Sequence, residues 1–144
     1  MMNEIKAIPN IYVHCVDVKD CSLAHLRAIE RPEAANQRFI LSPEISITFL
    51  ELGTILDQSL KASGYNYNIS LRTVSNWVLG IASWFSSEAS STLPFAKRPQ
   101  HRFNNTRSKE VLGIEYKRTP KELVVETALT LIETGLVPSK KKLT

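Results

Sequence analysis

The chain has 144 residues, a net charge of +4 and a mean hydropathy of −0.12, and 43% of its residues are hydrophobic. These values are typical of one globular domain, or part of one, and argue against extensive disorder. Two cysteines, Cys15 and Cys21, are too few for a disulfide framework and lack the spacing of a zinc site. The first ten residues lack the apolar segment of a signal peptide, so we expect a cytoplasmic protein.

The pattern of apolar and basic residues predicts neither a membrane span nor a nucleic-acid interface. The most apolar stretch, residues 74–85, is too short to cross a bilayer and is interpreted as a buried helix. Part of the basic excess lies in the run Lys140, Lys141 and Lys142, which is typical of a solvated chain end. Attachment of this run to an acidic membrane or nucleic acid is an alternative that salt dependence would test.

The beginning of the chain predicts a strand, a helix and a second strand. Residues 11–18 alternate β-forming and polar side chains and predict a strand. Asp20 is then placed to cap a helix over residues 21–30. Residues 39–41 are continuously apolar, which favours a strand buried on both faces. Such a unit implies a parallel pair, which needs further strands to make a sheet.

The middle of the chain predicts a capped helix. Thr48 and Glu51 have the spacing of a capping box, so the helix is expected to begin there and to end at Gly64. Residues 65–69 are consistent with another short strand. The order of these elements predicts a helix-rich α/β chain.

Helices dominate the expected second half. The Ser-rich residues 83–92 predict a loop after the apolar helix. Residues 104–106 offer capping side chains for a short helix that ends at Gly113. Thr119 and Glu122 form a second capping box, with a proline at the first helical position of the last helix.

Several segments carry motifs in a recognisable order. Residues 16–25 (VDVKDCSLAH) are similar to V-D-V-R-D-V-A-x-A-H, and residues 37–42 (QRFILS) to GRYILS. Residues 105–114 (NTRSKEVLGI) are similar to D-N-S-K-x-K-E-L-L-G-I, and residues 130–138 (TLIETGLVP) to SLIEKGLVP. The chain thereby resembles extended short-chain dehydrogenases/reductases of the dihydroflavonol-reductase, cinnamoyl-CoA-reductase and aldehyde-reductase group, in the NAD-dependent epimerase/dehydratase superfamily. Asn36 departs from the pattern, since glycine is usual there, but asparagine tolerates a left-handed backbone.

The resemblance spans nearly the whole chain but only the family's C-terminal portion. It implies one partial domain, residues 1–144, of an extended Rossmann-type fold with its last parallel strands and small substrate lobe. Residues 11–60 would form the end of the sheet with its flanking helices, and residues 61–144 the substrate lobe and C-terminal helices. The implied parent is an NAD(P)H-dependent carbonyl reductase, with NADP(H) as cofactor and a small aldehyde or ketone as substrate.

Two motifs of the family's chemistry are absent from the sequence. None of the five glycines belongs to a G-x-x-G-x-x-G turn, which lets the backbone approach a pyrophosphate. None of the four tyrosines is followed four residues later by the lysine that the family uses for proton transfer. We therefore expect this chain by itself to bind no cofactor and to be inactive. A missing N-terminal half, or a partner covering the sheet edge, would complete it.

The alternative is a non-catalytic, truncated reductase homologue that acts as an interaction or assembly protein, or that self-associates. An exposed sheet edge would favour such pairing.

The resemblance also suggests residues for a substrate pocket, because the family's small lobe lines one. The candidates are Trp77, Trp84, Phe95 and Arg98. For the aromatic side chains the alternative is ordinary core packing, and for Arg98 it is a solvated surface.

A further set of residues is interpreted as structural. Asp17 and Asp20 could form an acid/base pair with His14 and His25 as a relay, but no nucleophile or metal cluster accompanies them. Helix capping and hydrogen-bonded histidines are therefore favoured. The structural signature comprises Asp17, Asp20, His25, Lys109, Leu112 and Gly113.

Overall fold

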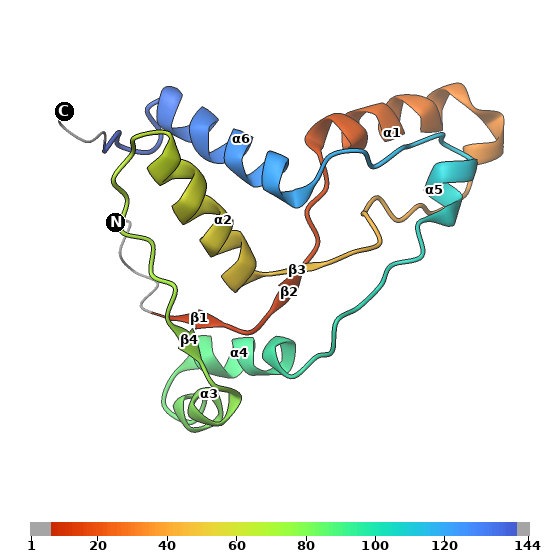
Figure 1. Cartoon of the computed structure of the whole chain (residues 1–144). Coiled ribbons are helices and arrows are strands. Elements are labelled where there is room, and N and C mark those ends of the chain that lie inside the picture. The colour runs from red at the N-terminus through yellow and green to blue at the C-terminus, as the bar shows by residue number, and fades with distance from the viewer. Residues whose placement is uncertain (1–6, 141–144) are drawn as a thin grey trace.

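The computed structural model describes residues 7–140 and has a mixed α/β, helix-rich architecture. In chain order its elements are β1 (Ile8–Pro9), β2 (Tyr12–Val13), α1 (Val18–Glu30), the short 3₁₀ helix η1 (Pro32–Ala34), β3 (Ile47–Thr48), α2 (Phe49–Ala62), β4 (Thr73–Val74), α3 (Asn76–Ala82), α4 (Ser87–Ala96), α5 (Thr106–Glu110) and α6 (Pro120–Glu133). Figure 1 shows α1 and α5 at one end, with the other four α-helices toward the opposite end.

The strands form two short pairs. β1 runs parallel to β4, with Ile8 opposite Thr73, and β2 runs antiparallel to β3. The predicted strand over residues 11–18 is therefore wrong in extent, because only Tyr12–Val13 of it forms a ladder. The parallel pair also joins different segments from those expected.

Residues 39–41, within the described part of the chain, belong to no strand, and of residues 65–69 only Tyr65 forms a single β-bridge. Phe39 and Leu41 instead pack against a buried cluster made by α1, η1 and the segment after α5. The apolar run thus reflects packing on helices and not burial within a sheet. Tyr67 is similarly buried beside α2 and α6.

Helix α1 begins earlier than predicted because Asp17, and not Asp20, is its N-cap. The Asp17 Oδ1 accepts a hydrogen bond of 2.9 Å from the Lys19 amide, which satisfies one of the free N–H groups of the first turn. Asp20 lies within that turn. The helix ends before Pro32 as expected, since Arg31 is extended with φ −108° and ψ 111°.

Helices α2 and α6 pack side by side (Figure 1). Together with the segment that follows α2, they bury Leu60, Tyr67 and Ile132. Both capping boxes are confirmed. Thr48 accepts from the Glu51 amide and Thr119 from the Glu122 amide, while each glutamate accepts from the backbone of its threonine.

The second core cluster lies at the other end of the molecule. It consists of Ala24, Ala34, Leu112 and Ile114. The Gly113 backbone, with φ 67°, turns the chain after α5 so that Ile114 enters this cluster. The predicted glycine stop is therefore confirmed.

The predicted buried helix over residues 74–85 is wrong in length and in environment. Helix α3 covers Asn76–Ala82, and Leu79 is its buried residue, whereas Trp77 is exposed. The expected Ser-rich loop is largely helix α4, capped by the Ser86 hydroxyl on the Ala89 amide. Serine hydroxyls thus began a helix where composition alone predicted a loop.

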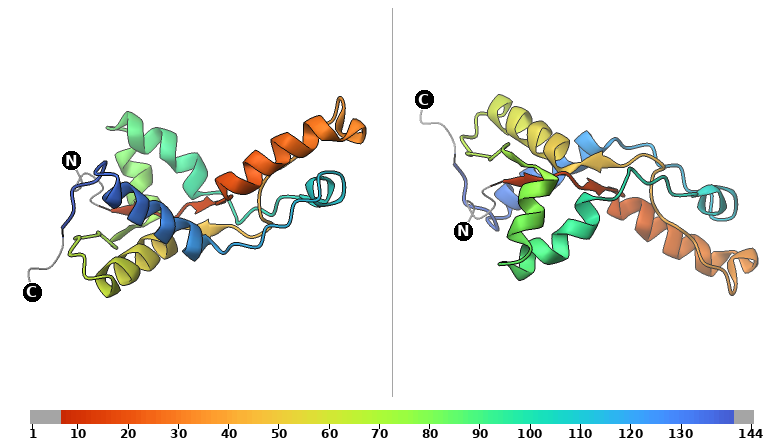
Figure 2. Two further views of the ribbon diagram at one scale, coloured as in Figure 1. Left: turned by 90° about the horizontal axis from the view of Figure 1, so that it is seen from above. Right: turned by 90° about the horizontal axis from the view of Figure 1, so that it is seen from below.

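Helices α3 and α4 form a hairpin on one side of the molecule, opposite α2 (Figure 2). No helix within residues 7–140 is long and apolar enough to cross a membrane. Of the terminal lysines, Lys141 and Lys142 lie outside the described residues.

Candidate functional site

The most distinctive hollow lies where the two parallel strands end. β1 and β4 run in the same direction, and their carboxyl ends open together into a space of about 780 Å³. In α/β proteins, ligands bind beyond the carboxyl ends of parallel strands. The lining residues are Pro9, Asn10, Thr48, Leu50, Glu51, Thr73, Val74, Ser75, Asn76 and Val78. We call this space the strand-end hollow.

The polar side of the strand-end hollow comes from residues that directly follow the strands. Asn10 directly follows β1, and Ser75 directly follows β4. Asn76 is the first residue of α3. Ser75 is the N-cap of α3, but its side chain makes no capping hydrogen bond. The Asn76 amide nitrogen donates to the Ala96 carbonyl at 3.4 Å, which ties the hollow to α4.

Glu51 is the titratable residue among those lining this hollow, and it is already engaged. Its carboxylate accepts bonds of 2.8 Å from both the amide and the hydroxyl of Thr48. These bonds, first the one from the Thr48 backbone, lower the pKa of Glu51. The hollow therefore offers hydroxyl and amide groups for binding a neutral polar molecule, and Glu51 serves the helix cap.

The predicted pocket residues lie outside the strand-end hollow. Trp77 is on α3, Trp84 in the α3–α4 turn, Phe95 on α4 and Arg98 just after α4. The structure brings two of them together, since the Arg98 guanidinium carbon lies 5.0 Å from the centre of the Phe95 ring. Both tryptophans are largely exposed.

Sequence reasoning missed Asn10, Ser75 and Asn76. The signal was the position of polar residues immediately after two strands. This signal could not be recognised in the sequence, because β1 and β4 have only two residues each and lie far apart in the chain.

Asp17 and Asp20 do not form a pair in acid/base chemistry. Asp17 is buried and binds the Lys19 amide and, at 3.0 Å, Arg118. The Lys19 amide, together with Arg118, lowers the pKa of Asp17. Burial, and then the charge of Asp17, raises the pKa of Asp20. The two pKa values shift in opposite directions because Asp17 is the N-cap of α1, whereas Asp20 lies within its first turn.

The two histidines contact different backbone carbonyls. The His25 Nδ1 lies 2.7 Å from the Cys21 carbonyl within α1, and the His14 Nδ1 lies 3.2 Å from the Pro43 carbonyl. The His14 ring also contacts the ring of Phe103, with 4.3 Å between the ring centres and the two planes tilted by 44°. These contacts fit structural histidines.

The segment around α5 contains two hydroxyl groups in contact, those of Ser108 and Tyr116. The Ser108 Oγ lies 2.8 Å from the Tyr116 hydroxyl, and Ser108 also donates to the Asn105 carbonyl. Lys109 is turned away to Glu44, with 2.6 Å between the Lys109 Nζ and the Glu44 Oε1. Since Ser108 is fully buried, this pair joins α5 to the following chain and is not a reactive serine–tyrosine–lysine arrangement.

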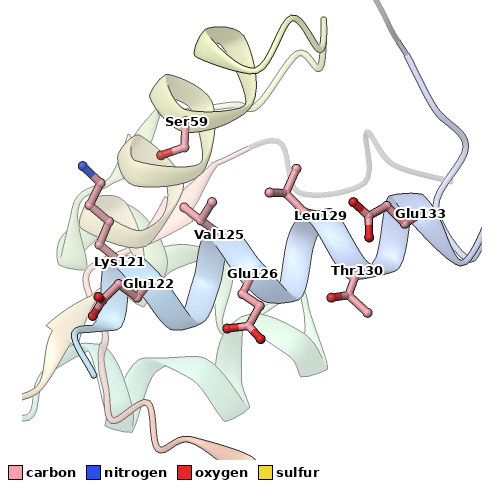
Figure 3. Close-up of a pocket in the computed structure, with 8 residues that line it drawn as sticks. All are labelled: Ser59, Lys121, Glu122, Val125, Glu126, Leu129, Thr130 and Glu133. Carbon is pink, nitrogen blue, oxygen red and sulfur yellow. The ribbon is translucent and has the colours of Figure 1, made fainter. Parts of the chain in front are cut away.

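A second hollow, of about 560 Å³, lies along α6 and beside Ser59 of α2 (Figure 3). Lys121, Val125 and Leu129 lie toward Ser59 of α2, whereas Glu126 and Thr130 point away from it. Glu126 is bonded to Arg118, which places this carboxylate in the network that joins α1 and α6.

The five glycines do not fit a dinucleotide pyrophosphate. Gly53 and Gly80 lie inside α2 and α3, and the other three follow the ends of α2, α5 and α6. A pyrophosphate requires a glycine turn that leads from a strand into a helix N-terminus. The described residues therefore do not fit NADP(H), and none of its chemistry is assigned to them. Among residues 7–140, no group of three His, Cys, Asp or Glu side chains fits a metal ion.

Comparisons with known proteins give no family: the chain matches no family model, no curated protein and no solved structure. A function is therefore inferred from the motifs of the chain and from the geometry of the strand-end hollow.

Proposed function

We propose that the chain is the substrate-binding, C-terminal portion of an NAD(P)H-dependent reductase of aldehydes or ketones. The observation that carries the proposal is the parallel pairing of β1 with β4, whose carboxyl ends share one hollow with both polar and apolar lining residues. This is the position at which α/β proteins bind small molecules. The ordered motifs at residues 16–25, 37–42, 105–114 and 130–138 support the same family.

Asn36 gives independent support from backbone geometry. Its φ is 57°, a left-handed conformation that favours glycine and is tolerated by asparagine. Reductases of the resembled group have glycine at this position. The departure of the sequence from the family pattern is thus the replacement that the backbone permits at least cost.

The proposed role of the chain is to hold the carbonyl compound. Asn10 and Ser75 supply hydrogen-bond donors for a carbonyl oxygen, and Val74 and Val78 supply apolar contact for the rest of the molecule. The nucleotide-binding half, with NADP(H) and the proton donor, would lie outside these residues. The chain by itself is expected to bind substrate without turning it over.

Isothermal titration with a panel of small aldehydes and ketones tests this proposal. Asn10→Ala and Ser75→Ala are each expected to weaken binding about fivefold to tenfold, the usual worth of one hydrogen bond. Ser75→Ala removes no capping bond, so the fold is expected to be kept. Ser59→Ala, in the hollow beside α6, is the matched control and should bind like the unaltered chain. Turnover by the purified chain, or equal binding by all variants, would contradict the proposal.

A second candidate is a non-catalytic interaction protein. It is favoured by the exposed apolar side chains of α1, among them Val18, Leu26 and Ile29, which a partner or a missing half would cover. Light scattering over a range of concentrations tests this candidate. A monomer at all concentrations that binds no apolar dye would count against it.

A further inference from the structure

The α3–α4 hairpin presents an unusual concentration of exposed aromatic surface. Trp84 and Phe85, in the turn of the hairpin, are each 87% exposed, and Trp77 on α3 is 70% exposed. Trp77 and Trp84 are the only tryptophans of the chain. Large aromatic side chains are rarely left in water in this way unless the surface binds something.

Two exposed side chains of α3 share one helical face, because Trp77 and Ile81 are four residues apart. Trp84 and Phe85 lie beyond the end of α3, in the turn that leads to α4. Leu79 faces the other way and is buried, as is Ala96 of the packed helix α4. The hairpin thus has its own small buried side and an apolar side that is left open.

The basic residues nearest to this apolar surface lie before α3 and after α4. No lysine or arginine occurs from residue 73 to residue 96. Arg72 precedes the hairpin, and Lys97, Arg98 and Arg102 follow it, all of them exposed. Because α4 has ten residues, Lys97 and Arg98 at its far end lie about 15 Å along the helix from the turn. Glu88 is the only acidic residue in the sequence from residue 58 to residue 109.

We infer that the α3–α4 hairpin docks on the surface of an anionic lipid bilayer. Trp84 and Phe85 would enter the interface between headgroups and acyl chains, where tryptophan is favoured, while the cations behind them meet lipid phosphates and carboxylates. This is attachment to the surface of the bilayer and not a span. It goes beyond the proposed reductase function, because these side chains lie outside the strand-end hollow.

The layered arrangement distinguishes a bilayer from nucleic acid. Proteins that bind single strands interleave basic and aromatic side chains along one groove, so that each ring stacks a base beside a phosphate contact. Here the turn presents Trp84 and Phe85 between two serines and carries no cation, and the basic residues Lys97 and Arg98 follow the far end of α4. A bilayer has the same order of layers, with hydrocarbon beyond charged headgroups.

Vesicle binding of the purified chain tests this inference. The vesicles contain phosphatidylcholine alone, or phosphatidylcholine with phosphatidylserine. We expect co-sedimentation with the anionic vesicles, a blue shift of tryptophan emission, and quenching by brominated acyl chains. Both tryptophans report directly, since both lie in the hairpin. High salt should weaken the binding.

Matched variants separate the hairpin from other exposed apolar surface. Trp84→Ser with Phe85→Ser should lower the partition coefficient at least about tenfold, because two interfacial aromatic anchors are lost. Leu26→Ser with Ile29→Ser, on the exposed face of α1, should leave it unchanged. Lys97→Ala and Arg98→Ala should each lower anionic-vesicle binding about fivefold.

Several results would overturn the inference. These are the absence of binding to anionic vesicles, equal binding to neutral vesicles, and unchanged binding by the Trp84→Ser, Phe85→Ser variant. Stronger binding to single-stranded nucleic acid than to vesicles would also overturn it, as would a blue shift that depends on protein concentration without lipid. If the double variant fails to fold by circular dichroism, the brominated-lipid quenching of the unaltered chain decides. Carbonyl binding at the strand-end hollow is measured without lipid and is unaffected by any of these results.

Discussion

Arg118, in the segment before α6, lies 3.0 Å from the carboxylate of Asp17, the residue that caps α1. The two residues are 101 positions apart in the sequence. Arg118 also bonds to Glu126 on α6, and Lys19 approaches Glu126 from α1. One arginine therefore connects the beginnings of two helices that come from opposite ends of the chain.

This contact predicts how stability changes in acid. The bonds from the Lys19 amide and Arg118 lower the folded-state pKa of Asp17 below its ordinary value of 3.8. Asp17 therefore contributes stability that is fully present above that ordinary value and is lost as the pH falls through the lower folded-state pKa. Urea unfolding between pH 6 and pH 2.5 should show this loss in the unaltered chain and a smaller loss in Arg118→Gln.

Glu126→Gln is the control for this experiment, because it breaks the other half of the network and keeps the Asp17–Arg118 contact. The pKa of Glu126 is also lowered, first by Arg118, so part of the acid sensitivity belongs to it. Equal pH dependence in the unaltered chain and Arg118→Gln would show that Asp17 is not stabilised by Arg118.

Two glycines should respond to alanine with opposite sign. Gly113 has φ 67°, and an added Cβ would lie 3.3 Å from the Arg31 side chain, so Gly113→Ala should cost about 1–2 kcal/mol. Gly80 lies inside α3 with open space at its Cβ, so Gly80→Ala should stabilise by about 0.5–1 kcal/mol. Denaturant unfolding measures both. The same sign for the two changes would contradict the assigned backbone conformations.

The cluster around Leu112 should be the most sensitive part of the core at that end of the molecule. Leu112 is 1% exposed and contacts the cluster that joins α1, η1 and the chain after α5. Leu112→Ala should cost about 2–5 kcal/mol through lost burial and the cavity left behind. Leu26→Ala, on the exposed face of α1, should cost much less. Similar losses of unfolding free energy for the two variants would contradict the packing.

The features that could be predicted from sequence are those decided within a few residues. The capping boxes at Thr48 and Thr119 and the turn at Gly113 follow from local hydrogen bonds and backbone conformation. The start of α1 was misplaced because Asp17 and Asp20 both suit a cap, and the contact with Arg118 involves a distant segment.

The strands and the strand-end hollow could not be predicted in the same way. Ile8 pairs with Thr73, and each strand has two residues, so neither carries a periodic pattern. Asn10 and Ser75 approach the same hollow only through that pairing. The exposure of Trp77 was missed for a related reason, since an apolar face predicts a helix but does not say what covers it.

The most direct test of carbonyl binding at the strand-end hollow is an amide NMR titration of the isotope-labelled chain with the aldehyde or ketone that binds it most tightly. We expect saturable shifts confined to Asn10, Ser75, Asn76 and their neighbours around the strand-end hollow. We also expect Asn10→Ala to reduce these shifts at equal ligand concentration. No saturable shift with any compound of the panel, or shifts centred on the hollow beside α6, would contradict the proposed binding site.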